Sequence, residues 1–121
     1  MMLESIDLVM GAIVLICILF DLLSGFVKGA YLNELSSTKM REGLFHKLGF
    51  ILAVILAFGA QTLCVWFELP EVFVTIYPAA CLWIVFTELV SIIENLCVFS
   101  PELANSPLAK LLESAEKEQN K

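Results

Sequence analysis

Three long apolar segments dominate the pattern of hydrophobic and polar positions along the chain: residues 8–27, 48–67 and 72–91. Each contains 20 residues. That is about the length an α-helix needs to cross a hydrocarbon core roughly 30 Å thick, since each residue advances the helix by about 1.5 Å. The pattern therefore predicts an all-α membrane protein with three transmembrane helices.

Signals for helix ends lie between these segments. Ser36, Ser37 and Thr38 form a helix-start signal, because their hydroxyls accept hydrogen bonds from the free N–H groups of a first helical turn. The second helix is therefore expected to begin near Lys39, ahead of its apolar part. After the second span, residues 68–71 (ELPE) place a proline and two acids where a lipid-facing helix is predicted to stop.

The tail of residues 100–121 predicts a short amphipathic C-terminal helix. Ser106 is a suitable N-cap, and Pro107 suits the first helical position. Apolar residues then recur at helical spacing, with lysines and glutamates mostly on the other side. This helix is either a solubilising tail or an element that lies on the membrane surface or mediates self-association. Its apolar positions are Leu108, Leu111, Leu112 and Ala115.

Composition supports a membrane protein. The 121 residues are 60% hydrophobic and 17% charged, whereas soluble domains average about 45–50% apolar and about 25% charged residues. A globule this small cannot bury all of its apolar residues, because much of its surface stays exposed. The apolar surface that remains outside is expected to face lipid. Residues 1–121 are interpreted as one membrane domain. Its acidic start is unlike a signal peptide, so the first span is expected to remain in the mature protein.

The distribution of charge predicts how the chain faces the membrane. The net charge is −6, yet four of the seven basic residues fall within the loop expected at residues 28–47. Short loops rich in Lys and Arg stay on the cytoplasmic side. The prediction is therefore a cytoplasmic basic loop, an outside N-terminus and a cytoplasmic C-terminus. No basic patch is large enough to indicate nucleic-acid binding.

Motifs for catalysis or metal binding are not recognisable in the sequence. The four cysteines are scattered singly through apolar runs, with no Cys-x-x-Cys pair, and are interpreted as small hydrophobic fillers. His46 is the single histidine and is interpreted as an interfacial side chain. Without a nucleophile–base pair or a phosphate-binding glycine loop, the chain is expected to be no enzyme and to use no cofactor or metal.

Asp21 is the energetically most expensive residue, because it lies inside the first apolar segment. An ionised Asp at a helix centre costs roughly 2.5–3.5 kcal/mol on insertion scales, and less off-centre. Lys28 lies roughly 10 Å further along the axis, too far for a direct bond. Lys47 on the second helix is the predicted partner. The alternative is an acid tolerated near the interface by local hydration.

A polar stripe is predicted on the third span. Thr87, Glu88, Ser91, Glu94 and Asn95 recur at helical spacing. One interpretation is a helix that leaves the membrane at this point. The other is a polar face that contacts further subunits or lines water.

Small residues indicate close helix packing. Gly49, Ala53 and Ala57, followed by Gln61, repeat every four residues along the second span, and Gly25 lies four residues before a second glycine. Small residues at this spacing let helix backbones approach, and an amide can form a hydrogen bond across the interface. The candidate pore or oligomer residues are Asp21, Gly25, Lys28, Lys47, Gly49, Ala53, Ala57, Gln61, Glu88, Ser91, Glu94 and Asn95.

Several motifs, in this order, resemble those of the toxin-secretion/phage-lysis holin family across roughly residues 21–112. The first, Asp-x-x-[Ser/Thr]-Gly-x-x-Lys, matches residues 21–28 (DLLSGFVK). A serine pair and Gly-Leu-x-x-Lys follow, similar to residues 36–37 and 43–47. The end of the last span is similar to residues 88–96 (ELVSIIENL). Family members often carry an acid near the end of the second span, where this chain has Gln61.

The resemblance implies a phage-encoded protein of the bacterial cytoplasmic membrane that forms homo-oligomers and opens lesions in the bilayer. Its functional partner would be a muralytic endolysin or, in some relatives, a large secreted toxin. An antiholin, or a small regulatory or structural subunit of a membrane complex, is the alternative. A small multidrug-type transporter ranks last, because such transporters resemble four-span proteins with an acid early in the first helix.

Overall fold

The computed structural model describes residues 2–70 and 75–119, and the regular elements in this part of the chain are all helices. Three of them are long and apolar enough to cross a membrane, with candidate spans at Ser5–Leu32, Ser37–Trp66 and Ile76–Phe99. The predicted all-α class with a short C-terminal helix is confirmed. The helices are α1 (Met2–Leu32), α2 (Ser37–Trp66), α3 (Ile76–Phe99), α4 (Pro101–Ala104) and α5 (Pro107–Gln119).

The segment 28–47, expected as a loop, is mostly helical, and the connection between α1 and α2 is only residues 33–36. Asn33 ends α1 with φ 61°, and Glu34 N donates to the Gly29 carbonyl at 2.8 Å, as in a Schellman C-cap. Ser36 caps α2 by accepting a hydrogen bond from Lys39 N, so the helix-start signal is confirmed. Polar residues end the lipid-facing surface here without breaking the helix.

The end of α2 follows the predicted turn. Glu68 adopts φ 50°, and Leu69 N donates to the Cys64 carbonyl at 3.0 Å, which is a second Schellman cap. Pro70 then prevents further helix. The predicted acid at position 71 and the predicted start of the third span at position 72 lie outside the described residues.

The third helix is longer than its apolar segment, because α3 continues beyond position 91 to Phe99. The short helix α4 that follows was not predicted. The predicted cap of the tail helix is confirmed, since Ser106 Oγ accepts a hydrogen bond from Ala109 N at 3.3 Å and Pro107 is the first residue of α5.

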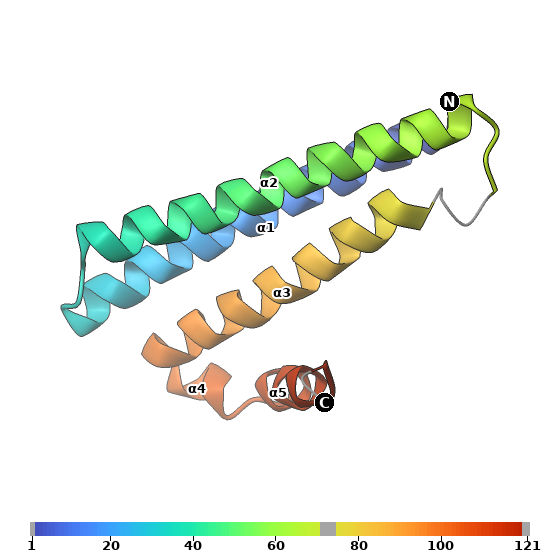
Figure 1. The fold of residues 1–121 in the computed structure, drawn as a ribbon. Coiled ribbons are helices and arrows are strands. Elements are labelled where there is room, and N and C mark those ends of the chain that lie inside the picture. The colour runs from blue at the N-terminus through green and yellow to red at the C-terminus, as the bar shows by residue number, and fades with distance from the viewer. Residues whose placement is uncertain (1, 71–74, 120–121) are drawn as a thin grey trace.

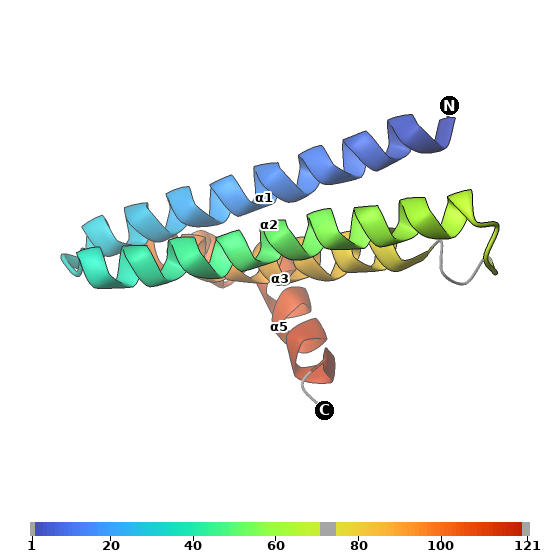
Figure 2. The same ribbon diagram turned by 45° about the horizontal axis from the view of Figure 1, so that its top comes forward.

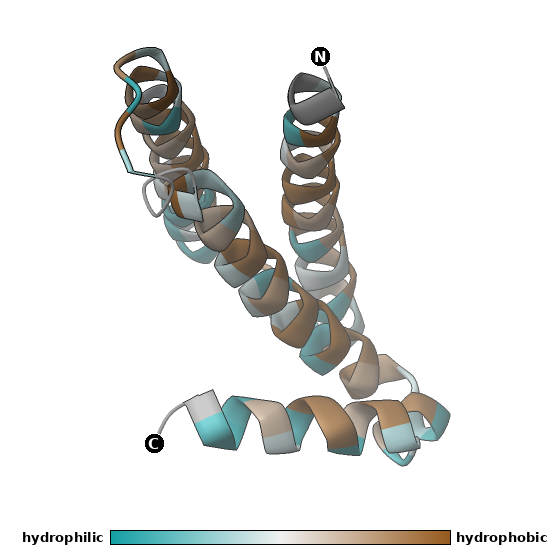
Figure 3. Ribbon diagram, turned by 90° about the vertical axis from the view of Figure 1, so that its right-hand side faces the viewer, coloured by the Kyte–Doolittle hydropathy of each residue, from teal (hydrophilic) through white to brown (hydrophobic). Residues whose placement is uncertain are grey.

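The three long helices lie alongside one another, as Figure 1 shows. Among these three helices, most contacts join α3 to α1, fewer join α3 to α2, and α1 meets α2 at few positions. Figures 2 and 3 show α1 and α2 spreading apart toward the N-terminus. The helix α5 contacts α3 and runs across the direction of the long helices (Figure 3).

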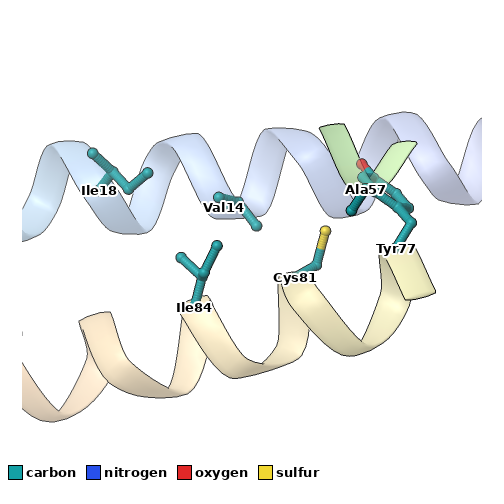
Figure 4. Close-up of a cluster of buried hydrophobic side chains, with 6 residues drawn as sticks. All are labelled: Val14, Ile18, Ala57, Tyr77, Cys81 and Ile84. Carbon is teal, nitrogen blue, oxygen red and sulfur yellow. The ribbon is translucent and has the colours of Figure 1, made fainter. Parts of the chain in front are cut away.

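The apolar core is thin and comes from all three long helices (Figure 4). Most other large apolar side chains point outward. Leu56 is 75% exposed, Leu82 72% and Trp66 79%. A soluble monomer rarely presents so much contiguous apolar surface, whereas a lipid-facing helix requires it. The core residues are Val14, Ile18, Ala57, Tyr77, Cys81 and Ile84.

Candidate functional site

One charged side chain from each long helix meets inside the bundle. Lys47 Nζ of α2 donates a hydrogen bond to Asp21 Oδ2 of α1. It also donates to both carboxylate oxygens of Glu88 on α3, each at 2.7 Å. Lys47 is therefore confirmed as the partner of Asp21, and Glu88 joins the same ammonium group. We call Asp21, Lys47 and Glu88 the ionic cluster.

Polar side chains of α1 and α3 complete the hydrogen bonding of Asp21. Its Oδ1 accepts from Ser91 Oγ at 2.8 Å and from Asn95 Nδ2 at 3.1 Å. Asn95 Nδ2 also donates to Ser24 Oγ at 3.0 Å, and the Ser24 hydroxyl donates to the backbone carbonyl of Asp21 at 3.1 Å. The buried carboxylate thus has partners on α2 and α3, and Ser24 of α1 joins the network through Asn95.

The ionic cluster is shielded from the surroundings. Glu88 is 0% exposed and Asp21 6%, while the Lys47 side chain is 14% exposed. The Lys47 ammonium also lies 5.6 Å from the centroid of the Phe50 ring, a distance typical of a cation–π contact. Buried charges of this kind are tolerated because each is paired and hydrogen-bonded. The cluster therefore fixes the register of the three helices.

Three further candidates lie near the cluster, and the structure places each of them differently. Gly25 of α1 lies against Asn95, since a Cβ at this glycine would be 3.7 Å from Asn95 Nδ2. Lys28 is half-buried on α1 and lines a cavity between α1 and α2. Glu94 is exposed. The polar stripe predicted on α3 is therefore split, with Glu88, Ser91 and Asn95 turned toward α1 and α2.

The small residues of α2 also divide. Ala57 is buried in the core at 8% exposure, whereas Gly49 and Ala53 are exposed. A Cβ added at Gly49 would meet no atom within 4 Å. The small-residue face of α2 is therefore only partly covered within one chain.

A second polar contact joins the helices nearer the N-terminus of α1. Tyr77 Oη donates to the backbone carbonyl of Asp7 at 2.7 Å, and Gln61 Nε2 donates to Asp7 Oδ2 at 3.4 Å. Gln61 is buried, and its Oε1 has no hydrogen-bond partner. The predicted cross-helix amide bond is present, but Asp7 and Tyr77 were missed. Asp7 precedes the apolar segment, so its position gave no sign of a contact with the other helices.

The chemistry available to these residues is electrostatic. Within residues 2–70 and 75–119, no three His, Cys, Asp or Glu side chains are grouped to hold a metal ion. The ionic cluster can hold the three helices together while it is dry. It can equally present two carboxylates and an ammonium group to water if the helices separate.

These features define a class: a small multi-span helical membrane protein with an apolar exterior and an internal ionic cluster. The family model described as the bacteriophage holin family matches residues 2–115. The chain belongs to the bacteriophage holin family, a class of non-enzymatic membrane proteins. The resemblance in the sequence motifs is confirmed. No curated protein and no solved structure gives a significant match.

Proposed function

We propose that the protein is a holin that forms homo-oligomers in the bacterial cytoplasmic membrane and opens lesions there. These lesions release a muralytic endolysin, or another large protein, from the cytoplasm. Membership of the bacteriophage holin family supports this class of function. The three apolar spans support residence in the bilayer.

The observation that carries the proposal is the buried ionic cluster. In a single bundle, the outer faces are apolar and the charges of Asp21, Lys47 and Glu88 face one another. A water-filled lesion requires polar groups along its wall, because an apolar wall disfavours water. We therefore infer that opening turns the ionic cluster toward water, with neighbouring copies meeting along exposed small residues such as Gly49 and Ala53.

An antiholin is the second candidate, and one observation favours it. Both oxygens of the Glu88 carboxylate, and both of the Asp21 carboxylate, accept hydrogen bonds from side chains of the same chain. A bundle whose charges are satisfied internally has less to gain from opening. Such a protein would restrain a holin by joining its oligomers without opening. The alternative of a small regulatory or structural subunit would give neither lysis nor restraint.

The first experiment is controlled induction in a bacterium that also produces a cytosolic muralytic enzyme without an export signal. Culture turbidity and the release of a large cytosolic protein are followed. A delay and then abrupt lysis that requires both proteins supports the holin. Normal growth despite confirmed membrane insertion contradicts it. Delayed lysis by a second, known holin would then identify an antiholin, and leakage of ions alone would identify a small channel.

The role of the ionic cluster is tested in the same strain with Asp21→Asn and Glu88→Gln. We expect both substitutions to change the time of lysis and the size of cross-linked oligomers, since each weakens the pairing that holds the closed bundle. Glu113→Gln is the matched control, because Glu113 lies on α5 in an exposed ion pair with Lys117. Unchanged timing and oligomer size in both cluster variants would reject this role and leave the holin function intact.

A further inference from the structure

A cavity of about 520 Å³ lies between α1 and α2, close to the connection that joins them. Glycines line it on both helices, among them Gly25 and Gly43, and leave room between the two backbones. A Cβ at Gly43 would meet no atom within 4 Å. The volume falls within the range of about 300–1,000 Å³ typical of small-molecule sites.

The lining of this cavity combines apolar and basic side chains. Phe26, Leu32 and Leu44 contribute apolar wall, and Lys28 and Lys39 contribute ammonium groups. Among the described residues, neither of these two lysines is in an ion pair. The third lysine of the lining, Lys47, is paired with Asp21 and Glu88 in the ionic cluster.

Two acids also line the cavity, and neither forms an ion pair with Lys28 or Lys39. Asp21 is bonded to Lys47, Ser91 and Asn95. Glu34 and Lys39 are both exposed, so both lie at the mouth of the cavity, and no ion pair joins them. Glu94 of α3 lies near enough to Lys28 to interact with it electrostatically, but the two form no ion pair. The cavity therefore offers two positive groups that, among the described residues, are outside any ion pair, beside an apolar wall, and this combination selects an amphiphilic anion.

The position of the cavity along the helices identifies the kind of amphiphile. The candidate span Ser5–Leu32 has 28 residues, so it is about 42 Å long at about 1.5 Å per residue. A hydrocarbon core is roughly 30 Å thick, and roughly 40–45 Å with its headgroup layers. The end of α1 that carries Lys28 and Leu32 therefore lies at headgroup depth. The apolar wall begins where the acyl chains begin.

We propose that this cavity binds an anionic phospholipid, with its phosphodiester between Lys28 and Lys39 and its upper acyl chains along Phe26 and Leu44. Basic pockets between transmembrane helices bind anionic headgroups in this way. A free phosphate ion would leave most of the volume and all of the apolar wall unused. The bound lipid would fill the space that separates α1 from α2 and hold this end of the hairpin in one geometry. The inference concerns lipid binding alone and does not depend on lesion formation.

Two independent changes test the site. Lys28→Gln with Lys39→Gln removes both charges, and Lys110→Gln with Lys117→Gln is the matched control, since these two lysines lie on α5 outside the cavity. Gly43→Leu fills the cavity without a clash at the added Cβ. Gly59→Leu is its control, because Gly59 is equally open but does not line the cavity.

The measurement is mass spectrometry of the intact full-length protein in neutral detergent, titrated with phosphatidylglycerol or with phosphatidylcholine. We expect saturable binding of phosphatidylglycerol and weaker binding of phosphatidylcholine. Removal of the cavity lysines should weaken binding roughly fivefold for each lysine, about 25-fold for the pair. Gly43→Leu should abolish saturable binding. Both control variants should bind as the unchanged protein does.

Other outcomes would overturn the proposal. Equal binding of the two lipids would show that the lysines do not select charge. Displacement of the lipid by millimolar inorganic phosphate would identify a simple anion site. Equal losses in the α5 control would indicate general attraction to a basic protein, and unchanged binding by Gly43→Leu would place the lipid elsewhere.

Discussion

Among the described residues, Lys47 has the largest structural role, since no other side chain there links the Asp21 and Glu88 carboxylates. Its ammonium donates to Asp21 on α1 and to Glu88 on α3. Without it, two acids would face each other at 6% and 0% exposure. Removing one partner of a buried ion pair is far more damaging than replacing the whole pair, because the charge left behind is uncompensated.

We therefore predict that Lys47→Met lowers the free energy of unfolding by about 3–5 kcal/mol. The measurement is equilibrium unfolding of the purified protein in mixed micelles as the fraction of denaturing detergent is raised. Lys110→Met is the control. Lys110 is exposed on α5, so its replacement should change stability by less than about 0.5 kcal/mol. Equal effects of the two substitutions would contradict a structural role for the ionic cluster.

The pairing of Asp21 with Lys47 was predictable from the sequence, because a buried acid needs a partner and the second helix supplies a basic residue near the same depth. The division of the α3 stripe follows from helix geometry. At about 100° per residue, Asn95 returns to within roughly 20° of the Glu88 direction, whereas Glu94 points roughly 120° away from it around the helix. Grouping these residues by polarity alone obscured that difference. The convergence of Glu88 on Lys47 was not predictable, since the relative rotation of packed helices is set by contacts remote in sequence.

At the scale of elements, hydrophobic length predicted the number of long helices better than their ends. The apolar segments locate the cores of α1, α2 and α3, but helix continues through Lys28 at one end and starts at Ser37 at the other. A helix satisfies its own backbone hydrogen bonds wherever it lies, so leaving the apolar core does not end it. Capping residues set its limits: Asn33 terminates α1, and Ser36 caps the start of α2.

The orientation of α5 gives a prediction that separates the two interpretations of the tail. This helix runs across the direction of the long helices (Figure 3), and Leu111 is 67% exposed. An interfacial helix buries its apolar face at the boundary of the acyl chains. Leu111→Trp should therefore fluoresce at shorter wavelength in vesicles than Glu113→Trp, in a background with Trp66 and Trp83 replaced by Phe.

Quenching by brominated lipids completes this comparison. Stronger quenching of the tryptophan at position 111 than of that at position 113 would place α5 on the membrane. Identical, water-like emission from both positions would identify a solubilising tail.

At the scale of the whole molecule, the basic residues gather where α1 joins α2. Lys28, Lys39 and Arg41 lie close to this connection, and short basic segments remain cytoplasmic. With three spans, the C-terminus then lies on the same side as this connection. We predict that a reporter fused after residue 121 is cytoplasmic and that one fused before residue 1 is outside.

Compartment-specific reporters measure this topology directly. A phosphatase active only outside the cytoplasmic membrane should be inactive at the C-terminal fusion point, and a fluorescent protein that matures only in the cytoplasm should be bright there. The reverse pattern would show that the acidic N-terminal segment, rather than the basic connection, is retained in the cytoplasm.

The dominance of α3 in the helix contacts also bears on biosynthesis. Because α1 and α2 contact each other at few positions, the nascent hairpin leaves the translocon as a loosely packed pair, held at its polar centre by Asp21 and Lys47. That pair is formally neutral. The third span, synthesised last, delivers Glu88 to an already paired ammonium group, so the interior acquires its extra negative charge in the final step.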